Sequence, residues 1–323
     1  MTEPLLDVRD LHVHFPIREG ALRRVTRHVR AVDGVSLTVG RGEILGLVGE
    51  SGCGKSTAGA AVLGMQAPTS GSVRFDGRDV AEMPAREIAR RMSVVFQDPT
   101  AALNPRMSIG DSIGEPLAIH RTGSARARAD RVAELMSLVG LDRSMAGRRP
   151  GALSGGQRQR VVIARALALD PDLVVLDEAV SALDVSIQSQ ILNLLLDLQA
   201  RLNLSYLFIS HDLSVIRHVT DRVAVMYLGR IVEEAAAEDL FAAPRHPYTA
   251  ALLSAVPRPE PGRRSGRVVL PGDAGADMTG GCRFAPRCPV ARPDCRDNDP
   301  ALVGGAHRAA CFYPDELSPD PGD

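Results

Sequence analysis

The sequence predicts an α/β protein with a largely parallel sheet at its core and a cysteine-bearing extension at its end. Between residues 173 and 228, apolar strand-like segments alternate with helical patterns, which is typical of strand–helix–strand units. A glycine-rich segment at 49–57 stands between a buried strand and a helix, where α/β folds bind phosphates. Near residue 256 the composition changes to PRPEPGRRSG, which indicates a linker. We therefore divide the chain into residues 1–256 and 257–323.

The composition limits the possible functions. The chain has 323 residues, a net charge of −1 and 3% aromatic residues with no tryptophan, so neither charge nor stacking surfaces favour a nucleic-acid partner. The N-terminus has early acids and no apolar signal segment, and no stretch offers 18 uncharged apolar residues. We expect the five cysteines to be cytosolic thiols or metal ligands, and any membrane role to come through a partner.

The N-terminal third is predicted to be rich in strands. Residues 5–15 alternate in strand fashion, 31–39 form a second strand, and 43–48 are nearly all apolar, as for a central strand. Between the first two lies an arginine-rich stretch, 16–30. Its simplest interpretation is a solvated hairpin loop, and the alternative is an edge that faces a membrane or a nucleotide.

The rest of the core alternates between helices and strands. The alanine–arginine run at 125–131 is interpreted as a solvated helix face. The predicted elements are a helix from 86 leading into a strand at 92–97, helical patterns across 108–147, a helix opened by Ser-Gly-Gly that continues through 161–169, strands at 173–177, 205–210 and 222–228, and helices at 187–202 and 213–219.

The segment GESGCGKS at 49–56, followed by Thr57, fits the P-loop pattern. Glycines let the backbone wrap phosphates, Lys55 reaches the β- and γ-phosphates, and the Ser56 hydroxyl ligates Mg²⁺. Cys53 is interpreted as a filler, although an exposed thiol there could be alkylated. The predicted ATP-binding residues of this loop are Gly49, Ser51, Gly52, Cys53, Gly54, Lys55, Ser56 and Thr57.

Polar residues follow three other predicted strands. LVVLDE at 173–178 puts Asp177 where it can hold Mg²⁺ and Glu178 where it can act as general base, although such a pair can also merely cap a helix. His211 ends an apolar strand and is assigned to the γ-phosphate. Gln97 could by the same geometry orient water or the metal.

The octapeptide LSGGQRQR at 153–160 predicts a second anion site. A hydroxyl and two glycine amides at a helix N-terminus point donors at a ligand, with the helix dipole adding to the attraction. Two phosphate-binding elements of different design in one chain suggest a nucleotide held from two sides.

These motifs together resemble those of ATP-binding cassette (ABC) ATPases, in which they occur in the same order over about residues 5–240. The resemblance implies a RecA-like parallel core, an antiparallel β subdomain and a helical subdomain at about 98–165. More narrowly, the chain resembles ATPase subunits of dipeptide and oligopeptide ABC importers. The segments that carry this resemblance are 28–37, GLVGESGCGKST (46–57), FQDPTAALNPRMSIGDSIGEPL (96–117), SALDVSIQSQIL (181–192) and HPYT (246–249).

The resemblance also assigns residues to a head-to-tail dimer in which each ATP lies between two subunits. The signature residues that would serve the partner's ATP are Ser154, Gly155, Gly156 and Gln157. Asp184 would lie at the dimer seam, and the segment after Gln97 would receive a membrane subunit. Phe15 is the candidate for stacking on adenine. One residue departs from the family pattern, since Ala179 stands where a proline usually follows the catalytic Glu178.

Four cysteines cluster in the extension, at 282, 288, 295 and 311. From the residues alone they could bind a metal or remain unligated thiols. Zinc usually takes paired knuckles of closer spacing, whereas four thiolates on long loops can hold an iron–sulfur cluster. The segment 281–314 resembles the C-terminal region of peptide-importer ATPases, which implies a [4Fe–4S] cluster on Cys282, Cys288, Cys295 and Cys311, with zinc as the alternative.

The resemblance implies an ATPase that powers peptide uptake at the cytoplasmic face of the cell membrane. Its implied partners are a paralogous ATPase subunit or a second copy, two permease subunits and a substrate-binding protein. An importer of another small solute such as nickel is the alternative, and a soluble ABC ATPase of repair or translation is less favoured because no long coiled coil or second cassette is present. A non-hydrolytic regulator is disfavoured by four intact residues: Lys55, Asp177, Glu178 and His211.

Overall fold

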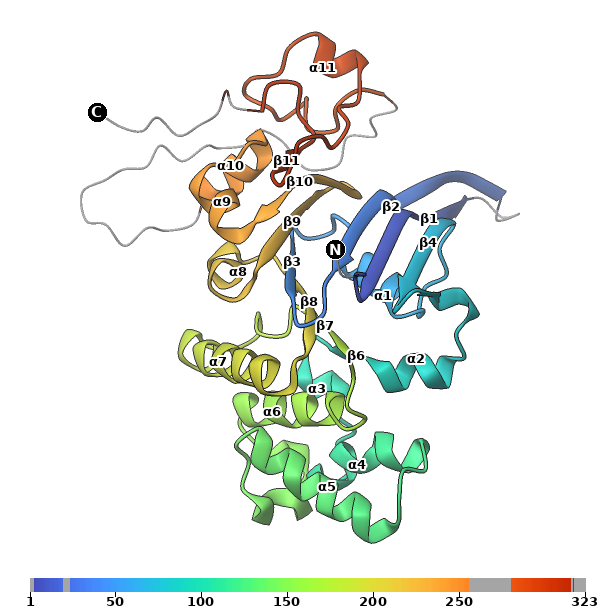
Figure 1. The fold of residues 1–323 in the computed structure, drawn as a ribbon, viewed down its shortest axis with the longest axis vertical. Coiled ribbons are helices and arrows are strands. Elements are labelled where there is room, and N and C mark those ends of the chain that lie inside the picture. The colour runs from blue at the N-terminus through green and yellow to red at the C-terminus, as the bar shows by residue number, and fades with distance from the viewer. Residues whose placement is uncertain (1–2, 20–23, 256–279, 315, 317–323) are drawn as a thin grey trace, which may run out of the picture.

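The computed structural model describes residues 3–19, 24–255, 280–314 and 316. The predicted linker PRPEPGRRSG, residues 257–266, lies outside the described residues. Figure 1 shows a central sheet with helices beneath it, a second sheet beside it and the C-terminal segment above it.

The central sheet has seven strands in the order β11-β10-β9-β3-β8-β7-β6. Strands β9, β3, β8, β7 and β6 run parallel, and β10 and β11 add an antiparallel edge. The parallel core predicted from the sequence is therefore present. The strands are β3 (Ile44–Val48), β6 (Met92–Val95), β7 (Leu173–Asp177), β8 (Ser205–Ser210), β9 (Arg222–Tyr227), β10 (Arg230–Ala236) and β11 (Arg308–Ala309).

Both faces of this sheet are buried, which explains why its strands are nearly all apolar. Along β7, Val174 and Leu176 face one hydrophobic core, while Leu173 and Val175 face the other. The first core includes the helices below the sheet, and the second includes helix α1 (Lys55–Val62) and the antiparallel sheet. The carboxyl ends of the parallel strands are therefore held by packing on both faces of the sheet.

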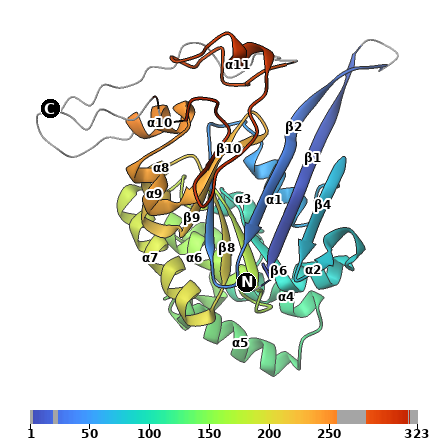
Figure 2. The ribbon, with the colours of Figure 1, turned by 45° about the horizontal axis from the view of Figure 1, so that its top comes forward.

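The antiparallel sheet has the order β2-β1-β4-β5, with β1 (Leu6–Glu19), β2 (Arg24–Val39), β4 (Ser70–Phe75) and β5 (Arg78–Asp79). Its long β1–β2 hairpin extends past the rest of the molecule (Figure 2). The expectation of a loop at 16–30 was wrong for the described part, because Pro16 still pairs with His28 and Ile17 with Arg27. The outer part of this hairpin is mostly exposed, so its residues need not alternate between apolar and polar. Only the backbone pairing identifies it as a strand.

The helices begin and end where capping chemistry is available. Ser154 begins α6, and Asn203, with φ of 52°, ends α7 in the left-handed conformation. The predicted helix through 169 ends earlier, at Ala166. The helices are α1 (Lys55–Val62), α2 (Ala85–Arg91), α3 (Pro99–Ala102), α4 (Ile109–Ile119), α5 (Ala125–Leu138), α6 (Gly155–Ala166), α7 (Val185–Leu202), α8 (Leu213–Val219), α9 (Ala237–Ala242), α10 (Pro247–Ser254) and α11 (Asp294–Asp297), with 3₁₀ turns η1 (Val80–Glu82), η2 (Arg143–Gly147) and η3 (Pro150–Ala152).

The C-terminal segment is built into the main sheet. Strand β11 pairs with β10, and the Ala310 amide donates to the Val232 carbonyl at 2.7 Å. The buried Glu233 carboxylate accepts from the Arg245 and His246 amides and pairs with His307 Nε2 at 2.6 Å. Across the part of the chain that is described, no helix has the length and apolarity that a bilayer span requires.

Candidate functional site

The P-loop connects β3 to α1 and is packed so closely that only glycine fits at two positions. A Cβ on Gly49 would lie 2.1 Å from the Met226 carbonyl oxygen, and one on Gly54 would lie 1.9 Å from that of Ala31. Gly54 also has φ of 108°, in the region that favours glycine. The loop therefore presses against β9 and β2, with the start of α1 behind it.

Lys55 is folded back onto its own loop. Its Nζ donates to the carbonyls of Gly49 at 2.8 Å and Glu50 at 2.9 Å, which compensates its burial. Cys53 is also buried, its sulfur lies 3.8 Å from Lys55 Nζ, and burial raises the pKa of its thiol. A buried, protonated thiol is a poor nucleophile, so the alkylation considered above is disfavoured.

Ser56 and Asp177 meet across the edge of the sheet. The Ser56 hydroxyl donates to Asp177 Oδ1 at 2.9 Å, although 121 residues separate them. Burial raises the pKa of Asp177, and the Ser56 hydrogen bond opposes this shift. A hydroxyl and a carboxylate of this kind are hard oxygen ligands suited to Mg²⁺.

The ends of β7 and β8 bring Glu178 and His211 together. Glu178 Oε1 lies 3.2 Å from His211 Nδ1, and the two side chains are 16% and 50% exposed. The Glu178 backbone is left-handed with φ of 49°, and its amide donates to the Ile209 carbonyl at 3.0 Å. A non-glycine residue held in this conformation points to a functional constraint.

Gln97 lies just beyond β6. The strand ends at Val95, so the predicted strand through 97 was two residues too long, and Phe96 is exposed. Gln97 Nε2 donates to Ser181 Oγ at 3.4 Å, and Gln97 and Asp177 line one cavity. Five of the predicted side chains thus lie at one sheet edge: Ser56, Gln97, Asp177, Glu178 and His211.

The signature segment lies elsewhere, at the start of α6. Ser154 Oγ accepts from the Gln157 amide at 3.3 Å, while Gln157 Oε1 accepts from the Ser154 amide at 3.0 Å, which forms a capping box. A Cβ on Gly156 would lie 2.7 Å from Ile187, so α6 packs tightly on the start of α7. Asp184 precedes α7 and is exposed, without a side-chain cap bond.

Phe15 lies in β1 opposite Val29 and is 39% exposed. Two residues beyond Val29 is Ala31, whose carbonyl abuts Gly54 of the P-loop. The strand pair that carries Phe15 therefore borders the phosphate loop.

The four clustered cysteines line one small cavity together with Phe284, Pro300 and Tyr313. Burial raises the pKa of Cys282, Cys288 and Cys311, the last to about 11. Within the described ranges, the set of three ligand atoms brought within 4.8 Å of one another belongs to His12, His14 and Asp33, and not to the cysteines.

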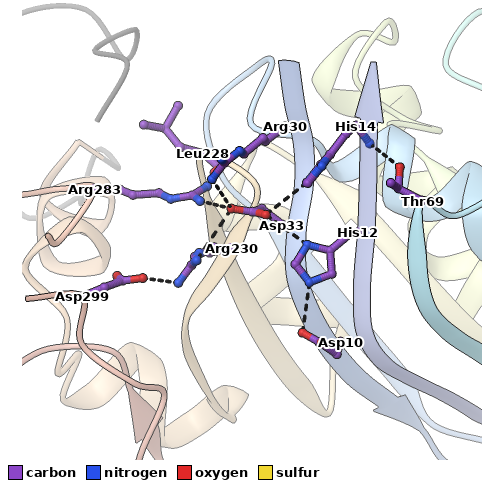
Figure 3. A network of polar contacts seen from close by, with 10 residues as sticks. All are labelled: Asp10, His12, His14, Arg30, Asp33, Thr69, Leu228, Arg230, Arg283 and Asp299. Atoms are coloured by element: carbon purple, nitrogen blue, oxygen red, sulfur yellow. Dashed lines mark hydrogen bonds and ion pairs between the residues drawn. The ribbon is translucent and has the colours of Figure 1, made fainter. Parts of the chain in front are cut away.

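That His12–His14–Asp33 set is an ion-pair cluster (Figure 3). Asp33 Oδ1 contacts His12 Nδ1 at 3.0 Å and His14 Nε2 at 3.1 Å, while Arg283 bonds the other oxygen. Arg30 and Arg230 also lie within 4 Å of that oxygen, at 3.8 and 3.6 Å. Three guanidinium groups around one carboxylate disfavour a cation there, and the cluster instead ties the C-terminal segment to β2.

Sequence reasoning missed a group of contacts on the P-loop residue Glu50. Arg287 donates to both Glu50 oxygens, at 2.8 and 3.0 Å, and the Glu50 amide donates to the buried Tyr248 hydroxyl at 2.8 Å. The HPYT segment carries part of the family resemblance, but no local pattern links Tyr248 or Arg287 to the loop.

Comparisons with known proteins agree with this geometry. Residues 32–181 match the family model described as ABC transporter, and residues 232–295 match that of the oligopeptide/dipeptide transporter C-terminal region. The chain is 48% identical over 319 residues to the oligopeptide transport ATP-binding protein AppF of Bacillus subtilis, covering 96% of this chain and 97% of that protein. It is 46% identical to the dipeptide transport ATP-binding protein DppF of Haemophilus influenzae, covering 97% of each.

Two solved structures show the same fold over most of the chain. CbiO1 from Clostridium perfringens, part of the ABC transporter complex cbiONQ, has a TM-score of 0.66 and 26% identity and covers 75% of this chain and 92% of that one. The ATP-binding cassette MJ0796, in a dimeric post-hydrolysis state with ADP and Pi, has a TM-score of 0.63 and 27% identity and covers 72% and 98%.

Proposed function

The chain belongs to the ABC transporter family, with the peptide-transport ATP-binding proteins as its relatives, and from this premise we propose that it is the ATP-hydrolysing subunit of a di- and oligopeptide importer. The similarity to those relatives runs through the whole chain and includes the C-terminal region particular to peptide transporters. This favours peptides over nickel or another small solute.

The observation that carries the proposal is the meeting of Ser56 with Asp177, and of Glu178 with His211, at one edge of the sheet. Lys55 would leave the loop carbonyls for the β- and γ-phosphates, and Ser56 and Asp177 would hold Mg²⁺ with help from Gln97. Glu178 would take a proton from the attacking water, while His211 would contact the γ-phosphate. Phe15 would stack on the adenine ring. Gly49, Ser51, Gly52, Cys53, Gly54 and Thr57 would complete the loop.

The signature segment fits a site shared between two subunits. The first-turn amides of α6 include those of Gly155 and Gly156, which lack intrahelical acceptors, as at any helix start. Exposed Ser154 and these amides would bind the partner's ATP, with Gln157 fixing the cap and Asp184 at the seam. We expect the second subunit to be a paralogous ATPase, and the assembly to include two permeases and a substrate-binding protein at the cytoplasmic face of the membrane.

Replacing Glu178 with Gln tests the catalytic assignment. The amide is nearly the same size but cannot accept the proton, so turnover should fall by at least about 100-fold while ATP binding persists and the closed dimer accumulates. The matched control is Glu134→Gln, the same change on the exposed surface of α5. Turnover near the wild-type rate in the Glu178 variant would show that another group is the base.

For the C-terminal region we propose a [4Fe–4S] cluster held by Cys282, Cys288, Cys295 and Cys311. Four thiolates around one zinc ion lie about 3.8 Å apart, given Zn–S distances of about 2.3 Å. Here no three cysteine sulfurs among the described residues fall within 4.8 Å of one another, although all four face one cavity. The described sulfurs therefore lack the close spacing of a single zinc site. Burial raises the pKa of Cys282, Cys288 and Cys311, so loading would release protons from these thiols. The cluster would cross-link a segment that has little core of its own.

Replacing Cys288 with Ser tests this proposal. We expect the purified protein to lose iron, acid-labile sulfide and the absorbance near about 400 nm that such clusters show. The control is Cys53→Ser, since Cys53 lies in the P-loop and away from the cavity. Stoichiometric zinc and no iron in the wild-type protein would overturn the choice of cluster.

A further inference from the structure

The segment from Cys282 to Cys288 ties three parts of the molecule together. Cys282 and Cys288 face the cysteine cavity, and Phe284 is buried between Tyr227 and Tyr248, with ring centroids 5.3 and 5.5 Å away. Arg287, directly before Cys288, points instead to the P-loop. Backbone bonds from Arg287 to Phe284 at 2.9 Å and from Cys288 to Ala285 at 3.3 Å fold this stretch into tight turns. Arg287 therefore cannot move independently of Cys288.

The contact of Arg287 with Glu50 is bidentate and largely shielded from water. The two guanidinium nitrogens lie 2.8 and 3.0 Å from the two carboxylate oxygens, and the side chains are 11% and 30% exposed. Paired geometry of this kind is the strongest that a guanidinium makes with a carboxylate. It also fixes direction, because both groups are planar.

Glu50 is not an ordinary surface acid, since it belongs to the loop that would receive phosphates. Its carbonyl oxygen accepts from Lys55 Nζ at 2.9 Å, and its amide is held by Tyr248 at 2.8 Å. A free carboxylate here would repel a polyphosphate, and a loop without its side-chain anchor would lose the position of that carbonyl. Arg287 counters both effects, because it supplies a positive charge and a rigid anchor.

We propose that Arg287 is a positioning residue of the nucleotide site, which holds and neutralises Glu50 so that ATP affinity depends on the folded cysteine segment. The inference rests on the proposed ATPase function. It makes the C-terminal segment part of the phosphate site without contact with the nucleotide. Because coupling between two sites is reciprocal, nucleotide binding should in turn stabilise the segment that carries Cys282 and Cys288.

The matched control is the other arginine of the same segment. Arg283 bonds Asp33 of β2 and the Leu228 carbonyl, so it anchors the segment to the antiparallel sheet without touching Glu50 (Figure 3). If Arg287 acted only by keeping the segment folded, removal of Arg283 would have the same effect on ATP as removal of Arg287.

The test measures MgATP affinity of the full chain by equilibrium binding in the Glu178→Gln background. KM and kcat are measured separately in the assembled transporter, in which Glu178 is unchanged. We expect Arg287→Ala to weaken ATP binding about 10-fold, Arg287→Lys to weaken it less, and Arg283→Ala to stay within about two-fold. KM should rise while kcat at saturating ATP changes little. Adding Glu50→Gln to Arg287→Ala should restore much of the affinity, because the unpaired charge is removed.

Three results would overturn the inference: unchanged affinity in Arg287→Ala, an equal loss in Arg283→Ala, or no recovery in the double variant. If Arg287→Ala does not fold, Arg287→Lys decides the same question, and wild-type affinity in that variant counts against the inference. A wild-type chain that binds no ATP would instead refute the proposed function, so the two failures are distinguishable.

Discussion

Replacing Ser154 with Asp separates the two roles of the signature serine, because it should preserve the helix cap and destroy the nucleotide site. Ser154 is exposed, and its hydroxyl accepts from the Gln157 amide at 3.3 Å. Aspartate is as good an N-cap as serine, and its charge at a helix start gains about 0.3–1 kcal/mol. The free energy of unfolding should therefore change by no more than about 1 kcal/mol.

The same Ser154→Asp substitution should weaken the binding of the partner's ATP, by far more than it changes the stability of the chain. If the phosphate of the partner's nucleotide occupies the position that the hydroxyl reaches, a carboxylate there lies about 4 Å from a negative charge. At an effective dielectric constant of about 20, this costs about 4 kcal/mol, which is about a thousand-fold in nucleotide-driven closure.

The assay compares chemical denaturation of the chain with ATP turnover of the assembled transporter purified from membranes. The control is Ser124→Asp, the same exchange at the exposed N-cap of α5, where the hydroxyl accepts from the Ala127 amide at 3.2 Å. Turnover within a few-fold of wild type in the Ser154 variant would refute the placement of this serine on a phosphate. A loss of stability above about 2 kcal/mol would refute the capping argument.

Two further predictions concern Phe284 of the C-terminal segment and His246 at the start of α10. Phe284→Ala should destabilise the C-terminal segment by about 3–5 kcal/mol, because the ring is fully buried. Phe312 is half-exposed in the same segment, so Phe312→Ala should cost little. Hydrogen-exchange protection measures both effects, and equal losses in the two variants would contradict the prediction. Burial lowers the pKa of His246 from 6.5 to about 3, so the folded state binds fewer protons than the unfolded one, and stability present above pH 6.5 is lost as the pH falls. Between about pH 7.5 and 5 this loss in the free energy of unfolding is about 2 kcal/mol. His246→Asn keeps a cap acceptor for the Tyr248 amide and should reduce the pH dependence of the free energy of unfolding by that amount. Identical pH profiles in the two proteins would exclude His246 as the cause.

Much of the core could be predicted from local patterns. Strands β7 and β8 and helix α8 have the predicted bounds, because short apolar runs buried on both faces end abruptly at polar residues. The meeting of Asp177 with Ser56, and of Glu178 with His211, follows from the rule that the carboxyl ends of parallel strands share one edge. The start of α6 was also predicted, since the capping residues Ser154 and Gln157 lie close together in the sequence.

The remaining features depend on contacts that leave no local pattern. The outer part of the β1–β2 hairpin is exposed, so no burial distinguishes Arg27 in a strand from an arginine in a loop. The pairing of β11 with β10 joins residues 74 or more positions apart, and the arginine contacts of Glu50 and Asp33 span 237 and 250. Such pairs are fixed by the assembled fold, and neither residue of a pair identifies the other.

The link between Glu50 and Arg287 also sets an order of events during synthesis. The P-loop leaves the ribosome early, yet one of its anchors lies 237 residues downstream. At about 5–20 residues per second, the loop would wait about 10–50 s for that anchor. During that interval the nascent chain holds Glu50 uncompensated, so a chain truncated before residue 287 should have an immature nucleotide site. Full affinity for ATP would thus be reached only after residue 287 has been translated and has folded against the loop.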